Sequence, residues 1–195
     1  MQINYDFFGT DQNLAPQKGR ILISEPFLLD NYFKRSIVLI TEHSEEGTVG
    51  FVLNKPVNLK INEVIADFPE TGAMVSLGGP VQTNTLHYIH TLGDIIPNSV
   101  KVFENIYWAG DFEIVKRLLE SGNLVPGNIR FFLGYSGWSA HQLDGELAEN
   151  AWIVTELNPQ EIMSPMNKHF WNKTLNRMGQ KYQMWSNFPE NPQMN

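Results

Sequence analysis

The residues most suggestive of reaction chemistry are Gly134-Tyr135-Ser136-Gly137-Trp138, which follow a short apolar run. A serine between glycines, after a strand and before a helix, is typical of the nucleophile elbow of hydrolases. Asp144 and His169 follow in the chain order that these hydrolases use. The fifth position, however, is Trp138, where the elbow requires a glycine so that strand and helix approach closely. We therefore interpret the segment as a structural turn, and a hydrolase using Ser136 is the alternative.

Histidines and carboxylates do not form a predicted metal site. Glu42 and His43 are adjacent at the expected end of a strand, so their side chains point to opposite faces. His87 and His90 are three residues apart, a spacing that separates them on a strand and would join them only on a helix. Zinc sites use three or four clustered protein ligands, and neither pair has a third. We expect no metal, no cofactor and no catalytic residue.

The elements that position these residues are short strands and helices without a regular β-α-β alternation, which predicts an α+β fold. Apolar runs predict strands at residues 20–24, 36–41, 49–53, 74–77, 86–89, 100–102, 106–108, 131–133 and 152–155. Helical spacing and capping residues predict helices at 61–68, 112–119, 139–147, from 158 onward and at 170–178. We expect a single domain with a mixed, largely antiparallel sheet or barrel-like strands, flanked by helices.

Three local features refine this scheme. Gly47 suits a turn, so the strands on either side of it form a hairpin, with a connection longer than the tightest types. Ser139 and Gln142 have capping-box spacing, in which the hydroxyl accepts one helix amide and the glutamine reaches back to another. The strand-to-helix turn before them leaves little room for a β-branched side chain at Gly137 if that glycine has positive φ.

Composition limits the classes of function. The chain has 195 residues and 42% hydrophobic content, enough for one domain, and its lack of cysteine excludes disulfides and thiol chemistry. A net charge of -7 disfavours direct nucleic-acid binding. No secretion leader or membrane-length apolar run is recognisable, so we expect no membrane contact and a cytoplasmic location. The expected organisation is an arm at residues 1–18, the domain at 19–187 and a tail at 188–195.

Five sequence blocks, in order, resemble the YqgE/AlgH family of bacterial proteins. They are FKRSIV (33–38), TEHSEEG (41–47), GFVLNKP (50–56), LGGPV (77–81) and GYSGW (134–138) with Gln142-Leu143. The match runs from residue 19 to about residue 179. The resemblance implies an α+β domain of mixed strands flanked by helices. It also carries the label of transcriptional regulator, through one member's link to exopolysaccharide control, and it brings no established catalytic residues.

Two positions depart from the family pattern. Many relatives have cysteine where this chain has Thr41, so a thiol-based sensing role is excluded here. His141 adds a titratable group where the family usually has glycine. We interpret His141 as an exposed residue at the start of a helix, and local tuning of a site is the alternative.

The polar and glycine-rich parts of these blocks all fall at the ends of predicted strands, where a rigid scaffold exposes groups to ligands. They form four groups: Glu42-His43, Asn54-Lys55, Gly78-Gly79 and Ser136-Gly137-Trp138. We predict that at least three groups converge on one groove, with Trp138 as a wall and Gln142 at its rim. The alternative is separate turns with separate structural roles. The predicted function is a non-enzymatic regulatory or binding module for an unknown small molecule or protein partner.

Overall fold

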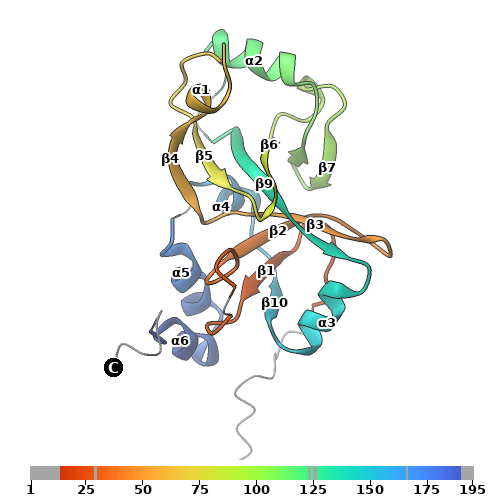
Figure 1. The fold of residues 1–195 in the computed structure, drawn as a ribbon, viewed down its shortest axis with the longest axis vertical. Helices are drawn as coiled ribbons and strands as arrows, with labels where there is room; N and C mark the ends of the chain where they lie inside the picture. The colour runs from red at the N-terminus through yellow and green to blue at the C-terminus, as the bar shows by residue number, and fades with distance from the viewer. Residues whose placement is uncertain (1–13, 29, 123, 125–126, 166, 190–195) are drawn as a thin grey trace, which may run out of the picture.

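The computed structural model describes residues 14–28, 30–122, 124, 127–165 and 167–189 (Figure 1). Most of the expected arm and tail therefore lie outside the described residues. Within them, ten strands form one sheet. The strands are β1 Ile21–Ser24, β2 Ile37–Ser44, β3 Gly47–Val52, β4 Pro56–Lys60, β5 Met74–Leu77, β6 Val81–His90, β7 Val100–Phe103, β8 Ile106–Trp108, β9 Ile129–Ser139 and β10 Trp152–Thr155.

The sheet is open and largely antiparallel. Its strand order is β10-β1-β2-β3-β9-β6-β8-β7, with β5 added to β9 and β4 added to β5. Only the pair formed by β5 and β9 is parallel among the described strands. The two end strands of this order do not pair with each other, so the barrel-like alternative does not form. The predicted α+β class with a mixed, mainly antiparallel sheet is confirmed.

Short helices flank the sheet in three places (Figure 1). They are α1 Ile61–Val64, α2 Phe112–Glu120, α3 Gln142–Ala148, α4 Pro159–Met163, α5 Phe170–Arg177 and α6 Gln180–Ser186, with a 3-10 turn at Gly93–Ile95. In the view of Figure 1, α1 and α2 lie at the top, α5 and α6 at the lower left, and α3 at the lower right. Two caps that the sequence predicts, at Asp111 and Asn158, form: the Asp111 carboxylate accepts helix amides of α2, and Asn158 forms a capping box at α4.

Three buried apolar clusters surround the sheet, and β9 contributes to all of them. Phe132 joins the cluster beneath α4, α5 and α6, which includes Trp171. Trp138 joins a second cluster with Trp152 near α3. Phe131 joins the third, beneath α1 and α2. The stretch 129–139 is therefore the element that links the separate parts of the core.

The predicted turn at residues 134–138 is wrong, because β9 continues through it as a strand to Ser139. This segment pairs with β3, which places Gly50 opposite Ser136, and with β6 at Val81. Ladder hydrogen bonds on both edges hold the backbone extended. Gly134, with φ of 64°, takes the left-handed conformation, and Gly137 does not have positive φ.

The predicted capping box before α3 forms only in part. Gln142 Oε1 accepts the Ser139 amide at 3.0 Å, as expected, but the Ser139 hydroxyl also approaches Gln142 Oε1, at 3.2 Å, and caps no helix amide. The residue at the cap position is His141, which has φ of 61° and an exposed side chain. The helix therefore begins at Gln142, three residues later than predicted.

Other elements differ from prediction in extent. The hairpin of β2 and β3 is tighter than expected, because Ser44 pairs directly with Gly47. The helix expected at 61–68 forms one turn, Ile61–Val64. Three elements were not predicted: β4, which begins at Pro56, the 3-10 turn at Gly93–Ile95, and α6, which follows Gly179.

Candidate functional site

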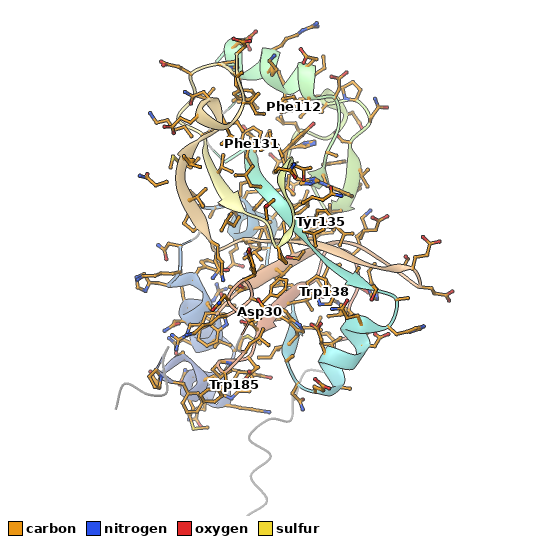
Figure 2. All side chains as sticks on the ribbon, viewed as in Figure 1. Asp30, Phe112, Phe131, Tyr135, Trp138 and Trp185 are labelled. Carbon is orange, nitrogen blue, oxygen red and sulfur yellow. The ribbon has the colours of Figure 1, made fainter. Side chains whose placement is uncertain are left out.

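The turn that precedes β2 is held by Lys55, which follows β3. Lys55 Nζ donates to the carbonyl of Tyr32 at 2.6 Å and to that of Asn31 at 3.2 Å. Asp30, which marks this turn in Figure 2, accepts the amides of Tyr32 and Phe33 at 2.7 and 3.0 Å. These hydrogen bonds fix both the turn and the half-buried ammonium beside it.

Asn54 joins the same turn to β2. Its side chain is 2% exposed; Oδ1 accepts the Ile37 amide at 2.9 Å and Nδ2 donates to the Arg35 carbonyl at 2.8 Å. A buried amide with both its donor and its acceptor engaged orders the surrounding backbone. Arg35 has φ of 51°, and its guanidinium carbon lies 5.0 Å from the Trp171 ring centre. The turn is thereby connected to α5.

Four cationic side chains line one pocket of about 180 Å³ at this turn, which we call the Lys55 pocket. They are Lys34, Arg35, Lys55 and Lys168, and the other lining residues are Asn31 and Asn54. Lys168 is exposed and comes from the segment between α4 and α5. The described residues of the lining include no carboxylate, although the chain as a whole is acidic. A concave site lined by one sign of charge concentrates the opposite charge, here an anion.

The electrostatics of Lys55 are set by burial and by two charged neighbours. Burial lowers the pKa of Lys55, the nearby Asp30 carboxylate opposes that shift, and Lys34 adds to it. Asp30 Oδ1 is already the acceptor for two backbone amides. An anion placed beside Lys55 would favour its charged form.

A second hollow, of about 160 Å³, adjoins the Lys55 pocket and shares Asn31 and Lys55 with it. Its remaining walls are Tyr32, Val52, Leu77 and Gly79. The tyrosine side chain is 47% exposed, so its ring is open to contact. A charged pocket next to a mainly apolar hollow suits a ligand with an anionic group and an uncharged body.

The family follows from comparison with known proteins. A family model described as AlgH-like matches residues 21–183 of the chain. The chain belongs to the AlgH-like family. It is 43% identical to a UPF0301 protein of Bacteroides fragilis over 100% of both chains. It is also 42% identical to a UPF0301 protein of Parabacteroides distasonis over 95% of both chains.

Two solved structures share the fold of this AlgH-like chain. The AlgH protein from Pseudomonas aeruginosa has a TM-score of 0.71 and 24% identity, covering 91% of this chain and 98% of its own. Protein DIP2367 from Corynebacterium diphtheriae has a TM-score of 0.73 and 22% identity, covering 91% and 95% respectively. Similarity at this level of identity establishes the fold alone. The family predicted from the five sequence blocks is confirmed.

Two pairs of the predicted groups of site residues each share one pocket or adjoining pockets, and a buried contact between Gly78 and Ser136 links the two pairs. Asn54 and Lys55 line the Lys55 pocket, and Gly79 lines the hollow that adjoins it. The other two groups meet elsewhere on the sheet. None of the pockets found among the described residues unites three groups in one groove.

The second pair meets on the surface of β2, β3 and β9. Glu42, Gly137 and Trp138 line a hollow of about 400 Å³ there. His43 lies on the same hairpin but does not line the hollow, and its Nδ1 is 2.7 Å from Thr48 Oγ1. Of these two adjacent residues, only Glu42 lines the hollow.

Gly78 and Ser136 contact each other inside the sheet. The Ser136 side chain is completely buried, and its hydroxyl donates to the Gly78 carbonyl at 2.9 Å. A Cβ on Gly78 would lie 2.2 Å from the Gly134 carbonyl oxygen, and one on Gly79 would lie 2.3 Å from that of Tyr135. We call this the glycine contact. A catalytic nucleophile must be open to its substrate, so the buried Ser136 hydroxyl does not fit the elbow considered from sequence.

Trp138 is mainly a core residue. It is 4% exposed, and its Nε1 donates to Glu146 Oε2 at 2.9 Å. Trp152 Nε1 donates to the same oxygen at 2.6 Å. Gln142 Nε2 donates to the other oxygen, Oε1, at 3.0 Å. One carboxylate thus connects two indoles to α3, which gives Trp138 and Gln142 a structural role beside the hollow.

The histidines of β6 have separate partners. His87 Nε2 is 2.9 Å from Thr85 Oγ1, and His90 Nε2 is 2.9 Å from the Ala109 carbonyl oxygen. Burial lowers the pKa of both imidazoles. No group of three metal-ligating side chains occurs among the described residues. None of the described helices combines the length and apolarity needed to cross a membrane.

Three of the four cations of the Lys55 pocket were absent from the predicted site. Lys34 and Arg35 belong to the FKRSIV block, so their adjacent charges were a signal in the sequence. Lys168 lies in no recognised motif, and only the fold brings it to the other cations. Tertiary structure was needed to find this part of the site.

Proposed function

We propose that this AlgH-like protein is a non-enzymatic, regulatory binding module for a small molecule that carries a multiply charged anionic group. The observation that carries the proposal is the convergence of four cations, Lys34, Arg35, Lys55 and Lys168, on one pocket among the described residues. Phosphoryl groups fit this description, because their oxygens accept several charge-assisted hydrogen bonds at once. The uncharged part of the ligand would lie in the adjoining hollow against Tyr32 and Leu77.

Regulation would follow because the pocket cations come from different segments of the chain. Lys34 belongs to the turn before β2, whereas Lys168 belongs to the segment between α4 and α5. An anion shared by both lysines favours conformations in which the two segments are close, and a ligand shifts an equilibrium by this kind of differential affinity. A partner that contacts either segment would then respond to occupancy of the pocket.

Isothermal titration calorimetry with inorganic pyrophosphate tests the proposal. We expect Lys34→Gln/Lys168→Gln to weaken binding at least about tenfold, because hydrogen bonds to charged groups contribute this much or more. The matched control, Lys60→Gln/Lys101→Gln, removes the same charge from exposed positions outside the pocket and should keep the affinity. An equal loss of pyrophosphate affinity in both double variants would show that only the net charge of the protein matters, and would contradict the proposal.

The proposal predicts that duplex DNA is not a ligand of this protein. The net charge of -7 opposes contact with a long array of phosphates, whereas one small anion can be enclosed by the local cations. A sub-micromolar mobility shift that weakens steeply with salt would contradict this part of the proposal.

A further inference from the structure

A pocket of about 370 Å³ elsewhere in the molecule contains one arginine in apolar surroundings. It lies where β4, β5 and the start of β9 face parts of α2 and α4, and Phe131 marks this end of β9 in Figure 2. Its walls include Ala73, Met74, Leu119, Phe131 and Met163, together with Arg130. We propose that this Arg130 pocket binds a hydrophobic carboxylate, with the carboxylate on Arg130 and the apolar body against these walls.

The Arg130 guanidinium is oriented by backbone carbonyls. Nη1 donates to the carbonyl of Ile162, and Nη2 donates to that of Leu53 at 2.6 Å. These acceptors engage two of the five N–H donors of an arginine side chain. The ion pairs found among the described residues do not include Arg130. Its positive charge is therefore held in place without a carboxylate partner in the described part of the chain.

Burial makes this uncompensated charge unfavourable. It lowers the pKa of Arg130 to about 10, and among the described residues no acidic neighbour opposes the shift. The Phe132 ring, 5.4 Å from the guanidinium carbon, and the Ile162 carbonyl near the end of α4 are both uncharged. The negative end of the helix dipole favours a cation there, which explains the orientation of Arg130. A ligand carboxylate would add the full negative charge that these groups lack.

The polarity of the pocket narrows the class of anion. Its volume lies within the range of small-molecule sites, and most of its walls are aliphatic or aromatic. One guanidinium matches one negative charge, whereas a phosphate dianion would leave a second charge unpaired in apolar surroundings. A monoanionic carboxylate with an aliphatic body satisfies both the charge and the walls.

The test compares octanoate, 1-octanol and octylammonium by isothermal titration calorimetry. The three probes share an eight-carbon chain and differ in the charge of the head group. We expect octanoate to bind at least about tenfold more tightly than 1-octanol, which corresponds to one charge-assisted hydrogen bond, and octylammonium to bind least. Equal affinities for octanoate and 1-octanol, or no binding of octanoate, would overturn the proposal.

Two variants locate the site. Arg130→Gln removes the charge and should abolish the preference for octanoate over 1-octanol. Because Arg130 also bonds two carbonyls, a second variant leaves it in place: Met74→Glu puts a carboxylate at a 46% exposed position of the pocket wall. It should weaken octanoate binding about tenfold, and the neutral control Met74→Gln should not. Unchanged octanoate affinity in both Arg130→Gln and Met74→Glu would refute the assignment.

This inference does not depend on the Lys55 pocket. Lys34→Gln/Lys168→Gln should bind octanoate as the wild type does, and pyrophosphate should not displace octanoate. Loss of octanoate binding in that double variant would place octanoate in the Lys55 pocket and overturn the proposal made here. A failure of pyrophosphate to bind would concern only the proposed function.

Discussion

The glycine contact and the Lys55 pocket use neighbouring parts of the same sequence blocks in opposite ways. At the glycine contact, Gly78 and Gly79 lie so close to β9 that an added Cβ would be within 2.3 Å of a backbone oxygen. At the Lys55 pocket, side chains surround about 180 Å³ of space. The first region has no room for a ligand and the second does. Polar and glycine-rich strand ends are therefore of two kinds. Some, such as Gly78 and Gly79, allow a neighbouring strand to approach closely, and others, such as Lys55, line a space that a ligand can enter.

This difference predicts two separate sets of mutational effects. Substitutions at the glycine contact should lower the free energy of unfolding and leave anion affinity of the folded protein unchanged. Substitutions of pocket cations should lower anion affinity with little effect on unfolding, because Lys34 and Lys168 lie outside the three apolar clusters. A variant that lowered the free energy of unfolding and the anion affinity by similar energies would contradict this separation of the two regions.

The largest expected effect is that of Gly78→Ala. Its Cβ would lie 2.2 Å from the Gly134 carbonyl oxygen, which is backbone and cannot rotate away. We expect destabilisation of about 3 kcal/mol, the upper part of the range for overpacking a closed interior, measured by urea denaturation. The control is Gly72→Ala, whose Cβ would have no heavy atom within 4 Å. Equal midpoints for the two variants would show that the close contact is not needed.

A smaller effect separates Ser136 from Gly137. Ser136→Ala leaves the buried Gly78 carbonyl without its hydroxyl donor and should cost about 1 kcal/mol. Gly137→Ala should cost less, because its nearest neighbour would be the Tyr135 ring at 3.3 Å, a side chain that can adjust. Thermal unfolding of both variants measures the order. A larger loss of stability for Gly137→Ala than for Ser136→Ala would indicate a strained backbone at Gly137, as in the turn that the sequence suggested.

The fold was predictable where the pattern depends on local chemistry. The runs within β1, β2 and β10 are apolar throughout, and Asp111 and Asn158 occupy recognisable cap positions, so these elements formed as expected. The turn predicted at residues 134–138 does not form, because glycine permits a turn but does not require one. Pairing with β3 and β6 decides that the segment is extended. A partner strand cannot be read from the segment itself.

The candidate site was predictable only in part, for the same reason. Asn54 and Lys55 were selected because they follow a strand, and the structure places both at the Lys55 pocket. Lys168 comes from a segment more than a hundred residues away. Trp138 and Gln142 were also selected, yet their polar atoms are used by Glu146 within the fold. Which polar groups remain for a ligand depends on hydrogen-bond partners that only the fold supplies.

The smallest expected effect is a pH dependence of anion binding that arises from Lys55. Its folded-state pKa is lowered from the ordinary 10.5, chiefly by burial, so the ammonium loses its proton at a lower pH than in the unfolded chain. Anion affinity should therefore decline as pH rises through that lowered value. The contribution of Lys55 to the free energy of unfolding should increase with pH over the interval from the lowered pKa to 10.5. In that interval the unfolded state binds more protons than the folded state.

Sulfate is the suitable probe for this measurement, because its own charge does not change between neutral and alkaline pH. Lys55→Arg is the matched variant, since arginine keeps its charge throughout this interval. We expect sulfate affinity of the wild type to decline with pH and that of Lys55→Arg to stay level. Identical pH profiles would assign the anion to Lys34, Arg35 and Lys168 without Lys55. That result would leave Lys55 with a structural role only, in which its ammonium holds the carbonyls of Asn31 and Tyr32. Lys55 would then resemble the residues of the glycine contact, which stabilise the fold and bind no ligand.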